Sequence, residues 1–423
     1  MRSVEEQQAR VSAAAVAPRP VRVAIAEAQG LMCAEEVVAE RPMPAFDQAA
    51  IDGYAVRSVD VLGADAIGDS SDGRGSAAEA VVTLPVLGVI EAGARTPTRL
   101  QPKLATRIQT GAPMPTLADA VLPLRWTDGG NSRVRVLRGV RPGDYVRRVG
   151  DDVQPGDVAV RAGTVVGAAQ VGLLAAVGRD RVLVHPRPRL SVMAVGGELV
   201  DVNRTPGNGQ VYDVDSYALA AAGRDAGAEV NRVGIVSHDP KKLREVVEGQ
   251  LNRAEVVVIA GGVGGAAADE VRAVLADLGD MEVARIAMHP GSVQGFGQLG
   301  PEGVPTFLLP TNPVSALVVF EVMIRPLIRL SLGKREPMRR MVQARTLGPI
   351  ASMPGRKGFL RGQLMRDEDT GEYLVQVLGV SGGTSSHLLA TLAEANCLVV
   401  VPEEVEQIAA GELVDVAFLA QRG

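Results

Sequence analysis

A run of glycines after a strongly apolar segment is the first feature of the sequence that could support chemistry. Residues 256–260 (VVVIA) are apolar and mostly β-branched, which is typical of a strand buried on both faces of a parallel sheet. Alanine-rich residues 266–278 follow at helical spacing, and between the two lie Gly261, Gly262, Gly264 and Gly265. In this order, backbone N–H groups and a helix N-terminus can face an anion such as phosphate, whereas a tight turn without a ligand is the alternative.

Two further polar segments also follow expected strands. Gly196-Gly197-Glu198 comes after residues 190–195, and Pro310-Thr311-Asn312-Pro313 comes after residues 306–309. Ligands of parallel sheets bind beyond the carboxyl ends of the strands, so we expect both segments and the glycine loop to share one edge. This convergence favours the anion site over the empty turn.

Carboxylates in the N-terminal half form a second group of candidates. Asp52 precedes Gly53 between apolar neighbours, so it can be a catalytic group or the anchor of an Asx turn. Residues 146–152 place two arginines before two aspartates across a glycine, and these either pair on the surface or line a polar pocket. Residues 109–115 (QTGAPMP) predict a rigid loop with special backbone positions.

The elements that must position these residues alternate between strand and helix from residue 190 onward. Repeated crossovers of this length predict a parallel sheet with helices on both faces. The predicted strands are 190–195, 230–236, 255–260, 283–288 and 306–309. The predicted helices are 215–226, 241–252, 271–278 and 314–332.

The remaining sequence predicts smaller, strand-rich parts. We expect helices over 4–15 and 23–40, a mobile loop over 64–80 and a short helix within 162–177. Short strands separated by proline and glycine predict a small all-β unit, and strands return after residue 341. We therefore divide the chain into 1–45 with 141–180, 46–140, 181–334, and 335–423.

Composition restricts the class of protein. Of 423 residues, 46% are hydrophobic, 22% charged and only 3% aromatic, which indicates a globular protein with aliphatic cores. A net charge of −5 argues against a general nucleic-acid-binding surface. Cys33 and Cys397 lack metal-ligand spacing, which indicates a reducing compartment. The N-terminus lacks a signal-peptide pattern and charges interrupt residues 314–332, so we expect a cytoplasmic protein without a membrane span.

Several long motifs, in one order along nearly the whole chain, carry a family resemblance. They are residues 46–55 (FDQAAIDGYA), 110–113 (TGAP), 118–121 (ADAV), 147–152 (RRVGDD), 196–199 (GGEL), 309–315 (LPTNPVS), Ser385, Ser386 and 393–398 (AEANCL). These resemble motifs of the molybdopterin molybdenumtransferase family, which is MoeA in bacteria and the E domain of gephyrin in animals.

The resemblance implies a fold and an activity. The fold is α/β plus β: an elongated four-part subunit with a central parallel-sheet α/β domain, an inserted small β domain and a C-terminal β-barrel-like domain. Two subunits form a homodimer with the active site between the α/β domain of one and the N-terminal part of the other. The reaction converts adenylylated molybdopterin and molybdate into molybdenum cofactor and AMP, with Mg²⁺ or another divalent cation.

The resemblance also implies site residues, carried over position by position. The acidic set falls on Asp52, Asp152, Glu198, Asp239 and Asp269, with Glu198 and Asp269 as metal ligands. The substrate-binding set falls on Thr110, Gly111, Gly261, Gly262, Gly264, His289, Ser292, Asn312, Ser315, Arg361 and Ser385.

Departures from the family pattern gather at the expected substrate edge. A family serine is Gly264 here, and two family lysines are His289 and Ser292, which removes up to two positive charges from an oxyanion pocket. The other departures are Gly197, Ala266, Ala267 and Thr311. They leave an alternative open: a catalytically weakened, gephyrin-like dimeric scaffold that binds peptides of membrane or cell-division proteins.

Overall fold

The computed structural model covers the whole chain and describes residues 1–62, 64, 82–96, 98–264, 268–379 and 388–419. The described residues form two compact units, one of residues 1–21 with 184–423 and one of residues 22–183. The chain passes between them through β1 (Val21–Ala24) and β12 (Arg181–His185), which are neighbours in a three-stranded sheet with β2 (Met32–Cys33). Each unit is described by itself.

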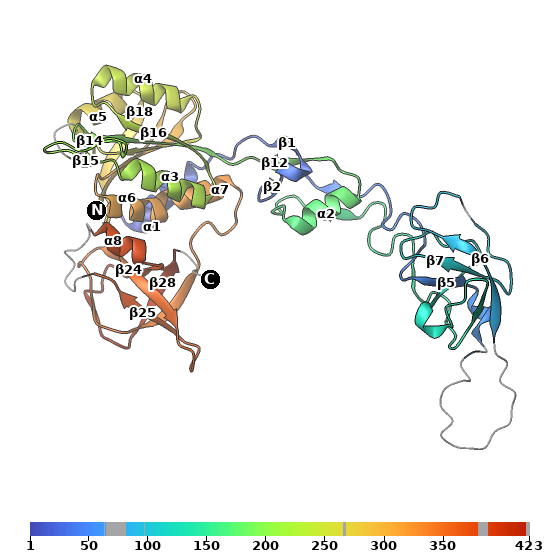
Figure 1. Cartoon of the computed structure of the whole chain (residues 1–423). Helices are drawn as coiled ribbons and strands as arrows, with labels where there is room; N and C mark the ends of the chain where they lie inside the picture. Colours follow the sequence, from blue (N-terminus) through green and yellow to red (C-terminus); the bar gives the residue numbers. More distant parts are fainter. Residues whose placement is uncertain (63, 65–81, 97, 265–267, 380–387, 420–423) are drawn as a thin grey trace. The chain divides into compact units, whose positions relative to one another are not determined.

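A six-stranded mixed sheet forms the centre of the first unit (Figure 1). Its strand order is β16 (Glu229–Val236), β13 (Arg189–Val195), β17 (Val256–Ala260), β21 (Val304–Leu309), β20 (Val293–Leu299) and β18 (Gly279–Arg285). The first four strands are mutually parallel, as predicted. The prediction of an entirely parallel sheet is wrong, because β20 runs antiparallel to both of its neighbours.

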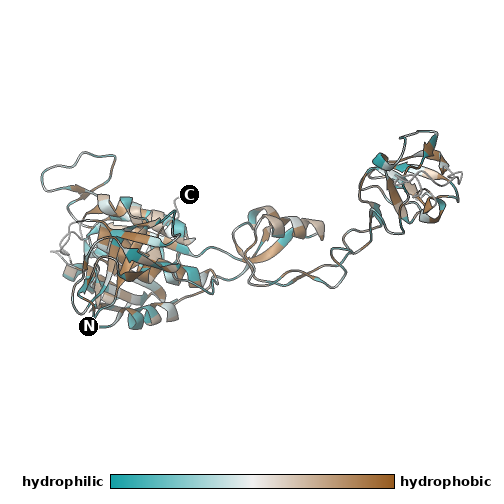
Figure 2. Cartoon of the chain, turned by 90° about the horizontal axis from the view of Figure 1, so that it is seen from below, coloured by the Kyte–Doolittle hydropathy of each residue, from teal (hydrophilic) through white to brown (hydrophobic). Residues whose placement is uncertain are grey.

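Helices cover both faces of this sheet, as the alternation predicts. On one face lie α1 (Val4–Ala13), α3 (Asp215–Ala226), α6 (Pro313–Val319) and α7 (Arg325–Ser331), with a π-helical turn at Phe320–Ile324 between the last two. The other face packs against α4 (Pro240–Leu251) and α5 (Ala268–Ala276). All residues of β17 are buried, so its apolar run lies in the core. Figure 2 shows hydrophobic segments concentrated in the interior of this unit.

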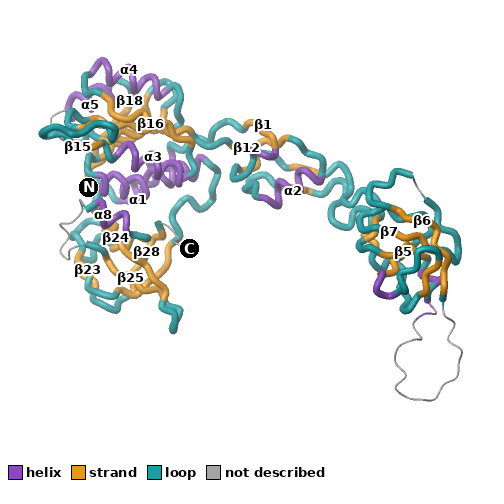
Figure 3. Tube along the Cα trace, in the orientation of Figure 1, coloured by secondary structure: helices purple, strands orange, loops and turns teal. Residues whose placement is uncertain are grey.

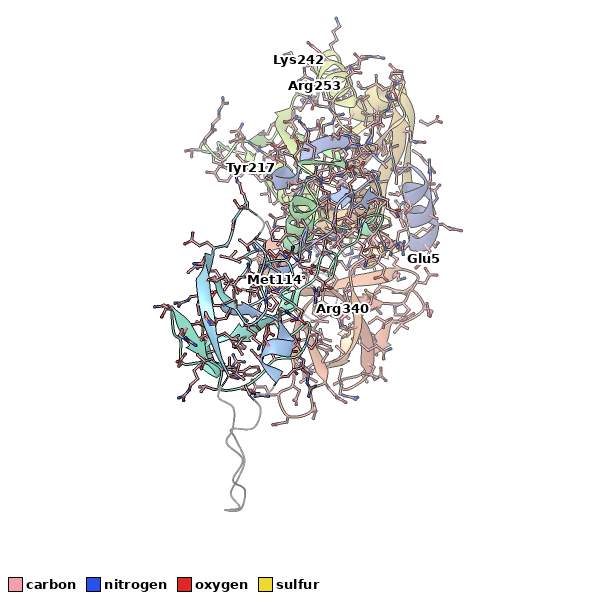
Figure 4. All side chains as sticks on the ribbon, turned by 90° about the vertical axis from the view of Figure 1, so that its right-hand side faces the viewer. Glu5, Met114, Tyr217, Lys242, Arg253 and Arg340 are labelled. Carbon is pink, nitrogen blue, oxygen red and sulfur yellow. The ribbon has the colours of Figure 1, made fainter. Side chains whose placement is uncertain are left out.

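The C-terminal part of this unit is a closed five-stranded barrel. Its strands are β22 (Met341–Thr346), β24 (Lys357–Arg366), β25 (Tyr373–Val377), β26 (Cys397–Val401) and β28 (Leu413–Phe418), and the pairing of β24 with β26 closes it. The short strand β19 (Met288–His289) pairs with β24, and α8 (Leu389–Glu394) contacts α6. Lys357 forms an ion pair of 2.5 Å with Glu5, which is labelled in Figure 4, and this pair ties α1 to the barrel. Short strands β14 (Leu199–Val200), β15 (Val211–Tyr212), β23 (Ile350–Ala351) and β27 (Gln407–Ile408) complete the unit.

The second unit is built mainly of strands and loops (Figure 3). A five-stranded sheet has the order β8 (Ala120–Pro123), β5 (Gly53–Val56), β7 (Ala105–Ile108), β6 (Thr83–Ile90) and β9 (Arg133–Arg135). Shorter pairs join β4 (Gln48–Ala49) to β10 (Val146–Arg147) and β3 (Val37–Val38) to β11 (Val158–Val160), and α2 spans Ala168–Ala176. The small all-β unit and the helix within 162–177 are therefore confirmed.

Of the predictions for the N-terminal half, one helix is wrong and one loop lies almost entirely outside the described residues. The helix predicted over 23–40 is wrong, because this segment forms β1, a 3₁₀ turn at Ile25–Glu27, β2 and β3. The predicted loop over 64–80 lies, apart from Ala64, outside the described residues. The predicted segment 1–45 begins in the first unit, where Val4 and Val11 join the core, and continues in the second. Its boundaries stay predictions.

Candidate functional site

Four parallel strands end together at one edge of the central sheet. Val195 lies opposite Val236, Ala194 opposite Ala260, and Ala260 opposite Leu309. Because these ends are in register, the segments that follow them emerge side by side: 196–198, 237–239, 261–264 and 310–312. The structure thus brings the three predicted motifs to one edge, which we call the rim.

The first two glycines of the loop are required by packing. Gly261 has a φ of +109°, and an added Cβ would lie 2.3 Å from the carbonyl oxygen of Val195. Gly262 has a φ of +74°, and its Cβ would lie 2.6 Å from Cγ1 of Val271. Gly264 is exposed and would meet nothing within 4 Å. The tight-turn interpretation therefore accounts for Gly261 and Gly262, but not for Gly264.

The same loop presents backbone donors. The N–H of Gly261 donates to the carbonyl oxygen of Leu309 at 2.9 Å, which fixes the loop to β21. Within the described part of the chain, the N–H groups of Gly262, Val263 and Gly264 donate to no other backbone carbonyl. Consecutive unpaired N–H groups around a residue of positive φ form a concavity suited to an anion.

The acidic residues of the rim differ in how they are held. Glu198 is exposed, and its carboxylate lies over Gly196, where an added Cβ would be 2.8 Å from Oε2. Asp239 is the N-cap of α4, since its Oδ1 accepts the N–H of Lys242 at 3.1 Å; Lys242 itself lies on the exposed side of that helix (Figure 4). Asp269 lies in the first turn of α5 with a fully exposed side chain. A structural role thus explains Asp239 by itself, whereas it does not explain Asp269.

Other predicted substrate-binding residues lie at the start of α6 and in the segment 288–292, which leads into β20. Asn312 is the N-cap of α6 and accepts the N–H of Ser315 at 3.0 Å. Ser292 donates its hydroxyl to the carbonyl oxygen of Ile286 at 3.0 Å. His289 is half-buried and pairs with Gly358 of the barrel strand β24.

Arg361 lies on β24, three residues beyond the pairing partner of His289. Its side chain is buried, and its Nη1 donates to the carbonyl oxygen of Leu388 at 2.9 Å, just before α8. Burial lowers the pKa of Arg361 from its ordinary value. Ser385 and Ser386 lie outside the described residues, as do Gly265, Ala266 and Ala267.

The predicted residues of the second unit form a separate group. Asp52 and Thr110 meet, because Oδ1 of Asp52 accepts the N–H of Thr110 at 2.8 Å, and Gly111 follows with a φ of +77°. Asp152 is exposed, and its N–H donates to the carbonyl oxygen of Met43 at 3.0 Å. The structure therefore brings Asp52, Thr110 and Gly111 together.

The arginines of residues 146–152 do not pair with the aspartates that follow them through their side chains. Arg148 instead forms an ion pair of 2.7 Å with Asp47, while its backbone N–H donates to Oδ2 of Asp151 at 2.6 Å. Partial burial opposes ionisation of Asp47, but the N–H of Val149 and the guanidinium of Arg148 hold the pKa of this carboxyl below its usual value. Arg148 thus forms a surface ion pair, as one of the two alternatives predicts, but its partner is Asp47 and not an aspartate of residues 146–152.

Sequence reasoning missed one charged residue that contacts the glycine loop. Arg272, on α5, donates to the carbonyl oxygens of Gly262 and Val263. Its spacing of three residues from Asp269 places both on one side of the helix, and this spacing was the available signal. The bond from Arg272 to backbone carbonyls could not be predicted, because every residue has a carbonyl and the sequence does not indicate which one is bound.

A divalent cation needs several ligand atoms close together, and few side chains of the described residues offer them. Among the residues that the structure describes, no three or more histidine, cysteine, aspartate or glutamate side chains gather to hold a metal. The two cysteines are free and buried, and burial raises the pKa of Cys397 to about 12, so neither is suited to binding metal as a thiolate. The side chains that the structure describes therefore form no preformed metal site by themselves.

Comparisons with known proteins agree with this arrangement. Three family models match in order: the MoeA N-terminal region (domains I and II) at residues 2–178, a probable molybdopterin-binding domain at 191–330, and the MoeA C-terminal region (domain IV) at 343–419. Within the described residues no helix is long and apolar enough to span a membrane.

Full-length relatives and solved structures match as well. Molybdopterin molybdenumtransferase 1 of Mycobacterium tuberculosis H37Rv is 80% identical over 100% of both chains. Molybdopterin molybdenumtransferase 2 of that strain is 37% identical over 97% of this chain and 98% of its own. A crystal structure of a MoeA protein of molybdopterin biosynthesis from Pyrococcus horikoshii has a TM-score of 0.80 at 30% identity and covers 99% of each chain.

Proposed function

The chain belongs to the MoeA family, and we propose that it transfers molybdenum from molybdate to adenylylated molybdopterin with release of AMP. The observation that carries this proposal is the 80% identity, over the full length of both chains, to a protein named molybdopterin molybdenumtransferase 1. Four of every five aligned residues are therefore shared with that protein along its whole length. No comparison supports the scaffold alternative.

The geometry of the rim suits a substrate with a phosphate linkage. Among the described residues, the N–H groups of Gly262, Val263 and Gly264 donate to no backbone carbonyl, and Glu198 and Asp269 are exposed carboxylates at the same rim. We assign phosphate binding to the loop and molybdate binding to Arg361, Ser315, Ser292, His289 and Ser385. Asp52, Asp152 and Asp239 stay assigned to the acidic set that positions metal and water.

A divalent cation can be held at the rim with few protein ligands when the substrate shares it. Mg²⁺ commonly uses one or two carboxylates together with substrate phosphates and water, and this mode needs no cluster of three protein ligands. We propose Glu198 and Asp269 as these carboxylates. When bound, the ion would neutralise phosphate charge, and no chemical step is assigned to it.

We also propose that the protein acts as a homodimer in the cytoplasm. The full-length match to MoeA structures supports a common assembly, and two free, buried cysteines suit a reducing compartment. Light scattering of the purified chain checks the dimer directly: a mass of one subunit at micromolar concentration would contradict it.

The test of the proposed function measures AMP release by the purified full-length chain with adenylylated molybdopterin and Mg²⁺. We expect AMP to appear only when molybdate is added. Glu198→Gln should remove most of this activity, whereas Glu229→Gln, at the opposite end of the same sheet, should leave it unchanged. A folded wild-type chain that releases no AMP would overturn the proposal.

A further inference from the structure

Arg272 holds the glycine loop through two neighbouring carbonyl groups. Its Nε donates to the carbonyl oxygen of Gly262 at 3.2 Å, and its Nη2 donates to the carbonyl oxygen of Val263. The planar guanidinium group has donors in a fixed fork, so one side chain can hold both oxygens at once. The glycine loop is therefore tied to α5 as well as to the sheet.

These two bonds decide where the N–H groups of the loop point. In a planar trans peptide, the N–H points away from the C=O of the same peptide group. The carbonyls that Arg272 holds share their peptide groups with the N–H of Val263 and the N–H of Gly264. Both N–H groups must therefore face away from Arg272, and Gly264 lies on the exposed side of the loop.

The positive charge of Arg272 is only weakly offset by its acidic neighbour Asp269. Its side chain is 37% exposed, and its ion pair with Asp269 spans 4.0 Å. Because the Asp269 side chain is fully exposed, water screens this pair, and such pairs contribute little. The guanidinium charge thus remains beside the glycine loop.

We propose that Arg272 is a positioning residue for the phosphate-bearing substrate. It aims the N–H groups of Val263 and Gly264 at a phosphate or pyrophosphate group and adds a positive charge behind them. The identity of that substrate rests on the proposed function, whereas binding of an inorganic anion does not. Lysine at this position would keep the charge without the fork, and methionine would keep neither.

The experiment uses the full-length chain and inorganic pyrophosphate as the probe. Titration calorimetry measures its affinity, and AMP release gives KM for adenylylated molybdopterin and kcat. We expect Arg272→Met to weaken pyrophosphate binding and raise KM by about 10- to 100-fold, the effect of losing charge-assisted hydrogen bonds, with a smaller change in kcat. Arg272→Lys should bind pyrophosphate more tightly than Arg272→Met. Its affinity should fall more steeply than that of the wild type as the salt concentration rises.

A surface arginine on the neighbouring helix provides the matched control. Arg244, on α4, is 43% exposed and pairs with Glu248 and Asp277, so Arg244→Met should bind pyrophosphate like the wild type. Wild-type affinity in Arg272→Met would overturn the proposal, as would a wild type that does not bind pyrophosphate. If Arg272→Met fails to fold, the test rests on Arg272→Lys. Wild-type affinity for pyrophosphate in that variant would contradict the proposal that Arg272 orients the N–H groups of the loop. Arg272-dependent binding without AMP release would leave this role standing and overturn the proposed transfer.

Discussion

Oδ1 of Asp52 accepts the backbone N–H of Thr110 at 2.8 Å and so joins two loops that are 58 residues apart in the sequence. Both residues belong to the predicted site, and their contact lies within one unit. Asp52 is exposed, so its second oxygen can face a ligand. The Asx-type anchoring role and the chemical role are therefore compatible in the same side chain.

Substitution of Asp52 can separate these two roles. Asp52→Asn keeps an oxygen that accepts the Thr110 N–H but removes the charge, so we expect an unchanged Tm and a loss of AMP release of about 100-fold, typical of a catalytic group. Asp52→Ala should in addition lower the free energy of unfolding by about 1 kcal/mol. Asp144, whose Oδ2 accepts the N–H of Arg141 at 2.8 Å, gives the control, since Asp144→Asn should retain activity. Full activity in Asp52→Asn would reduce Asp52 to an anchor.

The glycines of the loop should differ sharply in tolerance. Gly261→Ala brings a Cβ to 2.3 Å from the carbonyl oxygen of Val195 at a φ of +109°, so we expect a large loss of stability. Gly264→Ala meets nothing within 4 Å and should keep the wild-type Tm. Thermal unfolding of both variants checks this, and equal Tm values would mean that the loop does not have the geometry described.

Lysines at the positions of His289 and Ser292 should strengthen oxyanion binding. A dianion is attracted to added ammonium groups in a partly desolvated pocket, so we expect the double variant to lower KM for molybdate by about tenfold at low salt. The hydroxyl bond from Ser292 to Ile286 is lost in the process, so Tm should fall slightly. The control adds two lysines at exposed Gln298 and Gln343. An unchanged KM in the double variant would place molybdate elsewhere.

Protonation of Asp215 should make the free energy of unfolding depend on pH. Burial, and next the charge of Asp213, raise the pKa of Asp215 to about 7, and its Oδ1 is buried without a hydrogen-bond partner. The native chain then holds a proton that the unfolded chain releases above about pH 4. The contribution of Asp215 to stability is therefore fully present below pH 4 and is lost as pH rises toward 7.

Asp215→Asn should remove this loss, because asparagine does not ionise. We expect the variant to be more stable than the wild type at pH 8 by about 4 kcal/mol, since folding raises the pKa of Asp215 from 3.8 to about 7, and equal to it at pH 4. Urea unfolding at both pH values measures the difference. Asp280→Asn, at an exposed position on β18, should change neither value, and a wild-type pH profile in Asp215→Asn would disprove the burial of an ionisable carboxyl.

The central sheet illustrates how far the sequence determined the fold. The helix predicted over 215–226 is found with the same bounds, and the predicted strand 190–195 is extended by one residue. These elements have long periodic or uniformly apolar patterns, which carry their own structural signal. The carboxyl ends of parallel strands share one edge, so the gathering of the three motifs also followed from the sequence.

Long-range pairing decided what the sequence could not. Residues 23–40 have apolar spacing compatible with a helix, but β1 and β2 pair with β12, and β3 pairs with β11, more than a hundred residues away. Strand β20 likewise exists because it lies between β21 and β18. Strand formation depends on such partners, whereas helix formation depends on near neighbours.

The glycine loop combines both kinds of information. Its sequence determined that the backbone can approach an anion, because a strand, glycines and a helix follow one another. Only the tertiary structure decided that Gly261 and Gly262 are needed because of the close approach of Val195 and Val271, and that Arg272 binds the carbonyl oxygens of Gly262 and Val263. The physical reason is that a peptide group takes its orientation from whatever binds its carbonyl, and that partner is chosen by packing.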